Sequence, residues 1–125
     1  MRVIDAGVVV ELVARDLDAV ALGDEELGAP HLIDTEVTHA LRGLVRRGEL
    51  TESQATNALL GFTELTFTRY PADWLRPRMW ELRHNLSAYD ATYVALAEAL
   101  DATALLTTDA HLADAPGLRC PITLV

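Results

Sequence analysis

The apolar positions between Leu86 and His111 repeat with a helical period and then change to a continuous run. In the first half of this segment apolar side chains recur every three or four residues, at Tyr93, Leu96, Ala97 and Leu100. This spacing predicts a helix packed on one face, with Ser87 as its N-cap and Asp90 in its first turn. Ala104–Thr107 is a short apolar run, typical of a strand buried on both faces. The segment therefore predicts a helix and a buried strand, with Asp109 just past the end of the strand.

Similar patterns predict the remaining elements. Strands are expected over Met1–Asp5, Leu65–Tyr70 and Ile122–Val125, with another very short strand before His31–Ile33. Helices are expected over Val8–Val13, Asp34–Arg47, Thr51 to about Phe62, Asp73–His84 with Pro77 in a first turn or at a kink, and Ala110–Ala115. Asp16–Leu27 is expected to be helical or irregular, and Gly28–Pro30 to interrupt the chain. Strands that alternate with helices predict an α/β sandwich around a mostly parallel sheet.

Length and composition fit a single domain. The chain has 125 residues, half of them hydrophobic, and a typical domain has roughly 100–150 residues. No apolar run approaches the roughly 20 residues of a membrane helix, and Asp5 and Glu11 interrupt any apolar signal segment. The single cysteine, Cys120, has no partner for an internal disulfide. Residues 1–125 are therefore expected to form one domain located in the cytoplasm, without membrane association.

The charge of the chain is strongly negative. Ten basic residues, all of them arginine, stand against 19 acidic residues, and the net charge is −9. Such a chain lacks the overall basic character that usually provides affinity for phosphate. The acidic excess is either a solvated surface or, in part, a group of carboxylates that binds cations. The four histidines do not have the spacing of a zinc site.

Four acids occupy comparable positions in the predicted fold. Asp5 and Asp109 follow strands, whereas Glu36 and Asp90 lie in the first turns of helices. In an open α/β sheet, binding sites form beyond the carboxyl ends of the strands. Carboxylates gathered there raise one another's pKa unless a cation is bound. An all-oxygen set suits Mg²⁺ or Mn²⁺, and such ions activate water for phosphodiester hydrolysis.

Each of these acids also has an ordinary structural explanation. Asp5 and Asp109 are suitable caps for the helices that follow them. Glu36 suits the third position of a helix that starts near Asp34, and Asp90 suits the positive end of a helix dipole. The shared position of all four at one edge of the sheet favours the functional interpretation.

Several further residues have two interpretations. Thr107 is either a plain strand residue, like Thr108, or a group that orients a carboxylate or a water. Asp34 and Asp114 are expected to be surface acids. Two groups of residues remain. Arg42, Arg46 and Arg47 are either a solvated helix end or a contact to RNA phosphate. Trp74 and Trp80 are either core residues or dimer-interface residues.

Four segments occur in series along the chain: VIDAGVVVELV, HLIDTEVTHALRG, YDATYVALAEAL and ALLTTDAHL. Together they resemble the PIN-domain ribonucleases, in particular the VapC-type toxins of bacterial toxin–antitoxin pairs. The resemblance implies a three-layer α/β/α sandwich with a central sheet of four to five strands. It implies that Asp5, Glu36, Asp90 and Asp109 form an acidic metal-binding quartet. It also implies that Thr107 supplies the hydroxyl of the family's T-x-D turn.

The resemblance further implies Mg²⁺- or Mn²⁺-dependent endonucleolytic cleavage of RNA, homodimerisation and inhibition by a cognate antitoxin. One departure concerns Gly7, because the family often has Ser or Thr two residues after the first Asp. Two alternatives remain: a catalytically silent PIN fold that acts as an interaction module, and a receiver-like signalling domain that binds Mg²⁺. The complete quartet disfavours the first alternative. The absence of lysine disfavours the second, because receiver-like domains usually need a lysine after a late strand.

Overall fold

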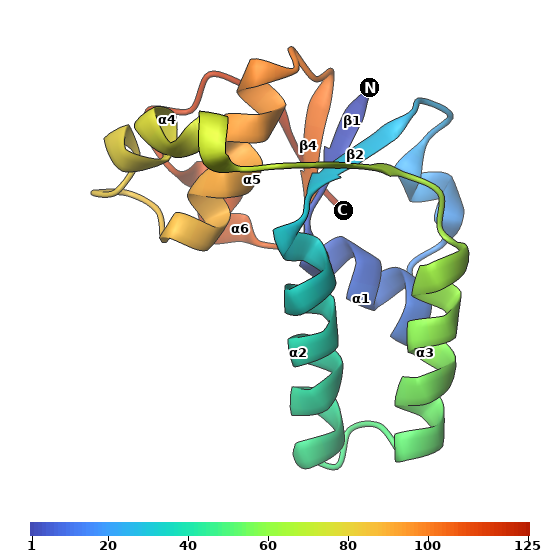
Figure 1. The fold of residues 1–125 in the computed structure, drawn as a ribbon. Coiled ribbons are helices and arrows are strands. Elements are labelled where there is room, and N and C mark those ends of the chain that lie inside the picture. Colours follow the sequence, from blue (N-terminus) through green and yellow to red (C-terminus); the bar gives the residue numbers. More distant parts are fainter.

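A parallel five-stranded sheet lies between two groups of helices in the computed structural model, which describes residues 1–125 (Figure 1). The strands are β1 (Arg2–Ile4), β2 (Leu27–Pro30), β3 (Thr68–Tyr70), β4 (Ala104–Thr107) and β5 (Ile122–Leu124), in the order β3-β2-β1-β4-β5. The helices are α1 (Ala6–Ala14), α2 (Leu32–Arg46), α3 (Glu52–Glu64), α4 (Arg76–Glu81), α5 (Ala88–Ala99) and α6 (Ala110–Asp114). All four strand pairs are parallel, which confirms the predicted three-layer α/β/α sandwich.

The central strands are buried because helices cover both faces of the sheet. α5 packs on β1, β2 and β4 on one side, with α4 outside it, whereas α1 lies on the other side with α2 and α3. Val3, Ile4, Leu105 and Leu106 have no exposed surface, as the apolar run of β4 predicts. In Figure 1, α2 and α3 form an antiparallel pair that extends away from the sheet.

α5 is more deeply buried than its sequence pattern predicts. All residues from Ala91 to Ala97 are buried, whereas the pattern predicts burial of one face only. The reason is that α4 covers the side of α5 that does not contact the sheet. Ser87 caps α5 as expected, since its side chain accepts the N–H of Asp90 at 3.2 Å. None of the helices has the length and apolar character that a membrane span requires.

β2 confirms the very short strand expected before His31, and it runs through Gly28–Pro30, which were expected only to end the preceding piece. Gly28 pairs with Val3 of β1, and Pro30 pairs with Tyr70 of β3. A Cβ on Gly28 would lie 3.1 Å from the Tyr70 ring and 3.2 Å from the Met1 sulfur. Glycine therefore allows close packing inside a strand here. The residue types of Gly28–Pro30 are not those that favour strands, so the segment carries no strong local strand signal.

Several predicted boundaries also shift. α2 begins at Leu32 rather than Asp34, so Glu36 lies in the second turn and not the first. α3 continues to Glu64, which shortens β3 to Thr68–Tyr70. The helix predicted over Asp73–His84 divides into a 3₁₀ turn (Asp73–Leu75) and α4, with Pro77 in the first turn of α4.

The two tryptophans do not belong to the core. The side chain of Trp74 is 48% exposed and that of Trp80 is 68% exposed, so the core interpretation is wrong for both. Trp74 lies in the 3₁₀ turn and Trp80 in α4, the short helical segments on either side of Pro77. A role of these residues in a dimer interface stays a prediction.

Candidate active site

The two adjacent strands β1 and β4 place Asp5 and Thr107 side by side. Asp5 directly follows β1, and Thr107 ends β4. The residues just before them, Ile4 and Leu106, pair across the two strands. The Thr107 hydroxyl donates a hydrogen bond to Oδ2 of Asp5. The same hydroxyl accepts the backbone N–H of Asp109 at 3.0 Å. Thr107 is therefore a buried strand residue that also orients a carboxylate.

Asp5 and Asp109 both cap helices, as their structural interpretation predicts. Oδ1 of Asp5 accepts the N–H of Val8 at 2.9 Å, and Oδ1 of Asp109 accepts the N–H of His111 at 2.9 Å. A carboxylate has about four lone-pair sites, so one capping bond leaves acceptor capacity on each side chain. Capping thus fixes the direction of these carboxylates without preventing them from binding a cation.

Glu36 from α2 and Asp90 from α5 complete the acidic cluster. The negative charges of Asp90 and Glu36 raise the pKa of Asp5, the charge of Asp90 raises the pKa of Glu36, and the charge of Asp109 raises the pKa of Asp90. Asp5, Glu36 and Asp90 therefore lie within electrostatic range of one another, and Asp109 lies within range of Asp90. They come from four separate segments of the chain that meet at the carboxyl edge of the sheet.

Burial is the main cause of the raised pKa values in this cluster. It raises the pKa of the Asp5 carboxyl from 3.8 to about 6, against the opposing effects of the hydrogen bonds from Thr107 and Val8. Burial also makes the largest contribution to the raised pKa values of Glu36 and Asp90. Ionised carboxylates in this position are destabilised by desolvation and by one another, and a bound cation would relieve both effects.

An unsatisfied oxygen marks the interior of the cluster. Oε1 of Glu36 and the hydroxyl of Tyr93 are buried, and neither completes a hydrogen bond of normal geometry. The two groups are nonetheless close. The pKa of the Tyr93 hydroxyl is raised mainly by burial and, next, by its interaction with Glu36, which requires the two side chains to be neighbours. Buried polar atoms without a partner are rare in proteins. Tyr93 was predicted only as a packing residue; its position three residues after Asp90 on the same helix is the available signal for a site residue.

The donor set fits a hard divalent cation. It consists of carboxylate oxygens, the ligands that Mg²⁺ and Mn²⁺ prefer. Oε1 of Glu36, which makes no hydrogen bond of normal geometry although the Tyr93 hydroxyl is nearby, provides a buried acceptor for such an ion. No three acidic, histidine or cysteine side chains are arranged as a ready coordination shell. The carboxylates therefore share one neighbourhood, and metal binding would require their side chains to turn toward a common point.

Gly7 has a neighbour that fills the space of a side chain. A Cβ on Gly7 would lie 2.6 Å from Oγ1 of Thr108 and 3.4 Å from Oδ1 of Asp5. The hydroxyl of Thr108 therefore occupies the region where a Ser or Thr side chain at position 7 would begin. Although Gly7 carries no hydroxyl, Thr108 places one at the position of the missing side chain.

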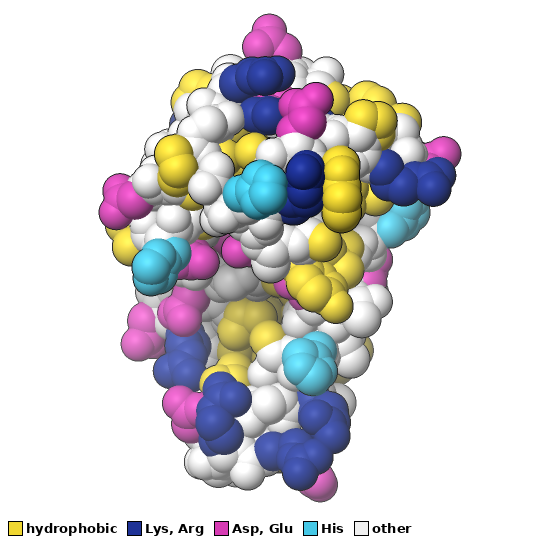
Figure 2. Space-filling view, turned by 90° about the vertical axis from the view of Figure 1, so that its left-hand side faces the viewer, with side chains coloured by type: hydrophobic (Ala, Val, Ile, Leu, Met, Phe, Trp, Pro, Cys, Tyr) yellow, Lys and Arg dark blue, Asp and Glu magenta, His cyan; other side chains and the backbone are white.

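Two cavities flank Gly7 and form a groove along α1 and α2. The first has a volume of about 680 Å³ and is lined by Ala6, Gly7, Leu32, Thr35, Glu36, His39, Ala40 and Tyr89. The second, of about 360 Å³, shares Gly7, His39 and Ala40 with the first and extends to Arg15 and Arg47. Figure 2 shows a hollow on this side of the molecule, with acidic side chains along its rim and arginine side chains below it.

The other charged candidates lie outside the acidic cluster. Asp34 accepts two hydrogen bonds from Arg69, at 2.6 and 2.7 Å, and Asp114 is exposed at the end of α6. Both are therefore surface acids, as expected. Arg46 and Arg47 are exposed at the end of α2, and Arg47 forms an ion pair with Glu49 at 2.7 Å.

Comparison with known proteins identifies the family. The sequence matches the PIN domain over residues 2–118. It is 45% identical over 126 residues to Ribonuclease VapC9 of Mycobacterium tuberculosis, covering 100% of this chain and 98% of the relative. It is 47% identical over 132 residues to Ribonuclease VapC1 of the same organism, covering 98% of this chain and 96% of the relative.

Solved structures show the same fold. The crystal structure of PAE2754 from Pyrobaculum aerophilum superimposes with a TM-score of 0.75 at 24% identity, over 97% of this chain and 81% of that chain. A chain from a toxin–antitoxin complex of Klebsiella pneumoniae superimposes with a TM-score of 0.68 at 17% identity, over the full length of both chains. With its sequence relatives taken into account, the chain belongs to the PIN-domain family and, within that family, to the VapC ribonucleases.

Proposed function

We propose that this protein is an endoribonuclease that depends on Mg²⁺ or Mn²⁺ and acts as the toxin of a toxin–antitoxin pair. The relatives that match it over their full length are ribonucleases by name. The observation that supports the proposal is that three partly buried acids from separate segments, Asp5, Glu36 and Asp90, have pKa values that are raised by their acidic neighbours in the set, with the exposed Asp109 close to Asp90. Because unpaired carboxylates are costly in such a place, their presence favours a functional cation site.

Asp5, Glu36, Asp90 and Asp109 would hold the cation, and Thr107 would act on Asp5 as a positioning residue. When bound, the cation supplies Lewis-acid chemistry, which lowers the pKa of water and neutralises charge on a phosphate. The capping bonds from Val8 and His111 keep the carboxylates of Asp5 and Asp109 in fixed directions. These bonds limit the reorganisation of Asp5 and Asp109, so the turning that metal binding requires would fall mainly on Glu36 and Asp90.

RNA would bind through local features of the groove rather than through net charge. The chain carries a net charge of −9, which disfavours general attraction of a polyanion. Arg15 and Arg47 lie at the far end of the groove, where both pair with Glu49 and Arg15 also pairs with Glu11, so an RNA phosphate would compete with these carboxylates for the two arginines. The proposal also includes a cognate antitoxin, a homodimer and a cytoplasmic location, in keeping with the family; the acidic cluster suits a cationic segment of such an antitoxin.

The direct test is cleavage of RNA by the purified protein in Mn²⁺. We expect cleavage to stop in excess chelator and in Asp90→Asn, while Asp114→Asn, which changes an exposed acid outside the cluster, stays active. Calorimetric titration with Mn²⁺ measures binding separately from activity. Cleavage that persists in chelator would contradict the metal mechanism, and absence of both binding and cleavage would favour an interaction module.

A further inference from the structure

We propose that the cavity beside Glu36 binds one unstacked nucleobase of the RNA substrate, and that Tyr89 is the surface on which this base stacks. This inference rests on the proposed function and specifies how the substrate lies at the site. It is carried by the composition of the cavity, by the exposure of one aromatic ring on its wall and by its position next to the acidic cluster.

The composition of the cavity suits a flat, mostly apolar group. Ala6, Leu32 and Ala40 provide aliphatic surface, and no arginine lines the cavity. It is therefore a poor site for a phosphate group, which is usually bound by basic side chains or helix N-termini. Its volume of about 680 Å³ lies within the usual range for pockets that bind small ligands.

Tyr89 has the exposure of a binding residue rather than a packing residue. It lies in the first turn of α5, a helix whose following residues are almost all buried, yet its side chain is 59% exposed. Tyr89 is one of the eight residues that line the cavity. Aromatic rings exposed in this way are the usual stacking surfaces for single-stranded nucleic acids, because every base has a flat face.

Polar groups on the cavity wall are placed to contact the edge of a base. The hydroxyl of Thr35 and the imidazole of His39 belong to exposed residues of α2 that line the same cavity. A hydroxyl both donates and accepts hydrogen bonds, and a neutral imidazole does the same through its two nitrogens. These groups can therefore discriminate between bases by their hydrogen-bonding edges, as in other proteins that recognise unpaired RNA bases.

The cavity is next to the acidic cluster. Glu36 belongs to both, and Gly7, another lining residue, lies beside Asp5. A base bound here would thus belong to a nucleotide close to the phosphate that is cleaved. The second cavity continues from Gly7, His39 and Ala40 toward Arg15 and Arg47, where a neighbouring phosphate would replace the carboxylates that pair with these arginines. A base paired in a duplex has both faces covered, so the substrate must be unpaired at this nucleotide.

The test combines variants of the protein with changes in the RNA. A short single-stranded RNA with a mapped cleavage point is prepared with an abasic nucleotide at each position around that point, and KM and kcat are measured in Mn²⁺. We expect Tyr89→Ala to raise KM roughly 5- to 100-fold, in the range of base–aromatic stacking, and Tyr89→Phe to behave like the wild type. Trp80→Ala is the matched control, because Trp80 is also exposed but does not line the cavity.

The decisive observation is coupling between Tyr89 and one nucleotide. At one position next to the cleavage point, the abasic change should weaken the wild type but add little to Tyr89→Ala. If the effect of the abasic change is the same in both proteins at every position, the stacking proposal is wrong. Because Tyr89 is exposed, we expect Tyr89→Ala to fold normally, and thermal unfolding verifies this.

A binding measurement separates this inference from the proposed function. Fluorescence anisotropy with the same RNAs in chelator reports affinity without cleavage. If the wild type does not cleave RNA in Mn²⁺ but Tyr89→Ala still weakens binding at one nucleotide, the cavity binds a base and the proposed function is wrong. If the wild type cleaves RNA and Tyr89→Ala changes neither KM nor affinity, the proposed function stands and the cavity is not a base site.

Discussion

The Thr107 hydroxyl donates a hydrogen bond to Oδ2 of Asp5 across the two central strands of the sheet. Because this hydroxyl also accepts the N–H of Asp109, one side chain sets the relative positions of two acids that are more than 100 residues apart in sequence. Strand pairing alone would place the backbones of these acids together. The threonine additionally fixes the direction of one carboxylate and the start of the turn that carries the other.

We predict that Thr107→Val lowers both stability and activity. Valine keeps the shape of threonine but removes the hydroxyl, so the partly buried N–H of Asp109 loses its partner at a cost of about 1–3 kcal/mol. The pKa of Asp5 should rise further, because the lost hydrogen bond lowers it. Urea unfolding measures the first effect, and the acidic limb of the pH–activity profile measures the second. Thr107→Ser keeps the hydroxyl and should restore both properties.

We predict that Asp5→Asn stabilises the metal-free protein at neutral pH while it abolishes cleavage. The pKa of Asp5 is raised from 3.8 to about 6, so between these values the folded state holds a proton that the unfolded state has released. The contribution of Asp5 to the free energy of unfolding is therefore largest below about pH 4 and is lost as the pH rises through 6. The difference between the folded and unfolded pKa values of Asp5 corresponds to about 3 kcal/mol of unfolding free energy at most. Asparagine lacks this penalty and is still a good N-cap.

Urea unfolding in chelator between pH 4 and pH 7 measures this effect. We expect Asp5→Asn to match the wild type near pH 4 and to exceed it progressively toward pH 7. Mn²⁺ should stabilise the wild type at pH 7 and leave the variant unchanged, since the variant lacks a ligand. A difference between the two proteins that does not vary with pH would contradict the assignment of the raised pKa to Asp5.

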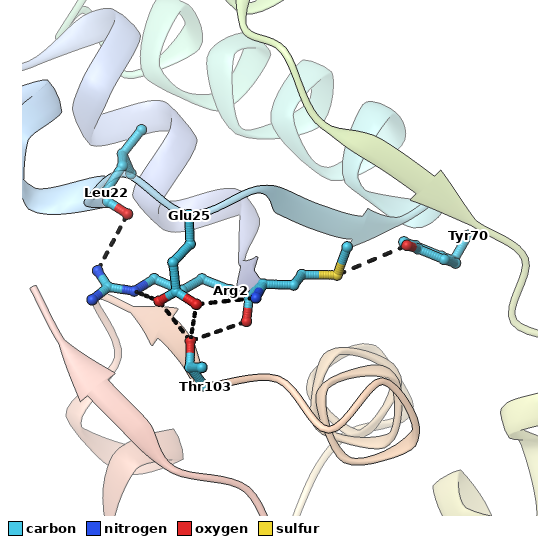
Figure 3. A network of polar contacts seen from close by, with 6 residues as sticks. Arg2, Leu22, Glu25, Tyr70 and Thr103 are labelled. Carbon is cyan, nitrogen blue, oxygen red and sulfur yellow. Dashed lines mark hydrogen bonds and ion pairs between the residues drawn. The ribbon is translucent and has the colours of Figure 1, made fainter.

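A second carboxylate should give the opposite pH dependence. Glu25 accepts hydrogen bonds from Thr103, from the amino group of Met1 and from Arg2, and it joins the loop before β2 to the starts of β1 and β4 (Figure 3). Chiefly because of the Thr103 hydroxyl, the pKa of Glu25 is lowered from 4.5 to about 2. Its stabilising effect is therefore present above pH 4.5 and is lost as the pH falls toward 2.

We predict that Glu25→Gln weakens the loss of stability between pH 4.5 and pH 2. The amide keeps the shape of the side chain but does not titrate. The measurement is thermal unfolding over this pH range. Glu26→Gln is the matched control, because Glu26 is an exposed neighbour without a side-chain partner, and it should keep the wild-type pH dependence. Equal pH dependence of the wild type and Glu25→Gln would show that this contact does not stabilise the protein.

Arg69 should support the position of Glu36. Its guanidinium forms a two-point hydrogen bond with Asp34 in the first turn of α2 and lies over the ring of Phe67 at 4.3 Å. We predict that Arg69→Ala costs about 1–2 kcal/mol, the sum expected for a partly exposed ion pair and a cation–π contact. Because Glu36 lies two residues after Asp34, RNA cleavage should also fall.

The measurements are urea unfolding and kcat. Arg69→Lys should recover little, because lysine cannot form the two-point contact with a carboxylate. Arg42→Ala, which removes an exposed arginine from the middle of α2, is the control and should leave both quantities unchanged. Full activity of Arg69→Ala would show that the start of α2 does not depend on this contact.

The sequence by itself determined the elements whose signals are local. The apolar run of β4, the cap and period of α5, and the acids that follow strands all depend on residues within a few positions of each other, and the structure has them where the patterns indicate. The positions of Asp5 and Asp109 after strands were therefore predictable without coordinates, whereas the role of the four acids as metal ligands stays a prediction. The proximity of the acids was not predictable in this way, because it depends on which strands pair.

Only the tertiary structure decided the features that depend on distant segments. β2 passes through Gly28 and Pro30 because its neighbours Val3 and Tyr70 come close on either side, and no local pattern records such packing. The hydroxyl of Thr108 above Gly7 and the exposed ring of Tyr89 on the cavity wall likewise result from contacts between α1, α2, α5 and the end of β4. Local periodicity is encoded within a turn or two of chain, whereas a site and its cavity are made by segments that only the packed core brings together.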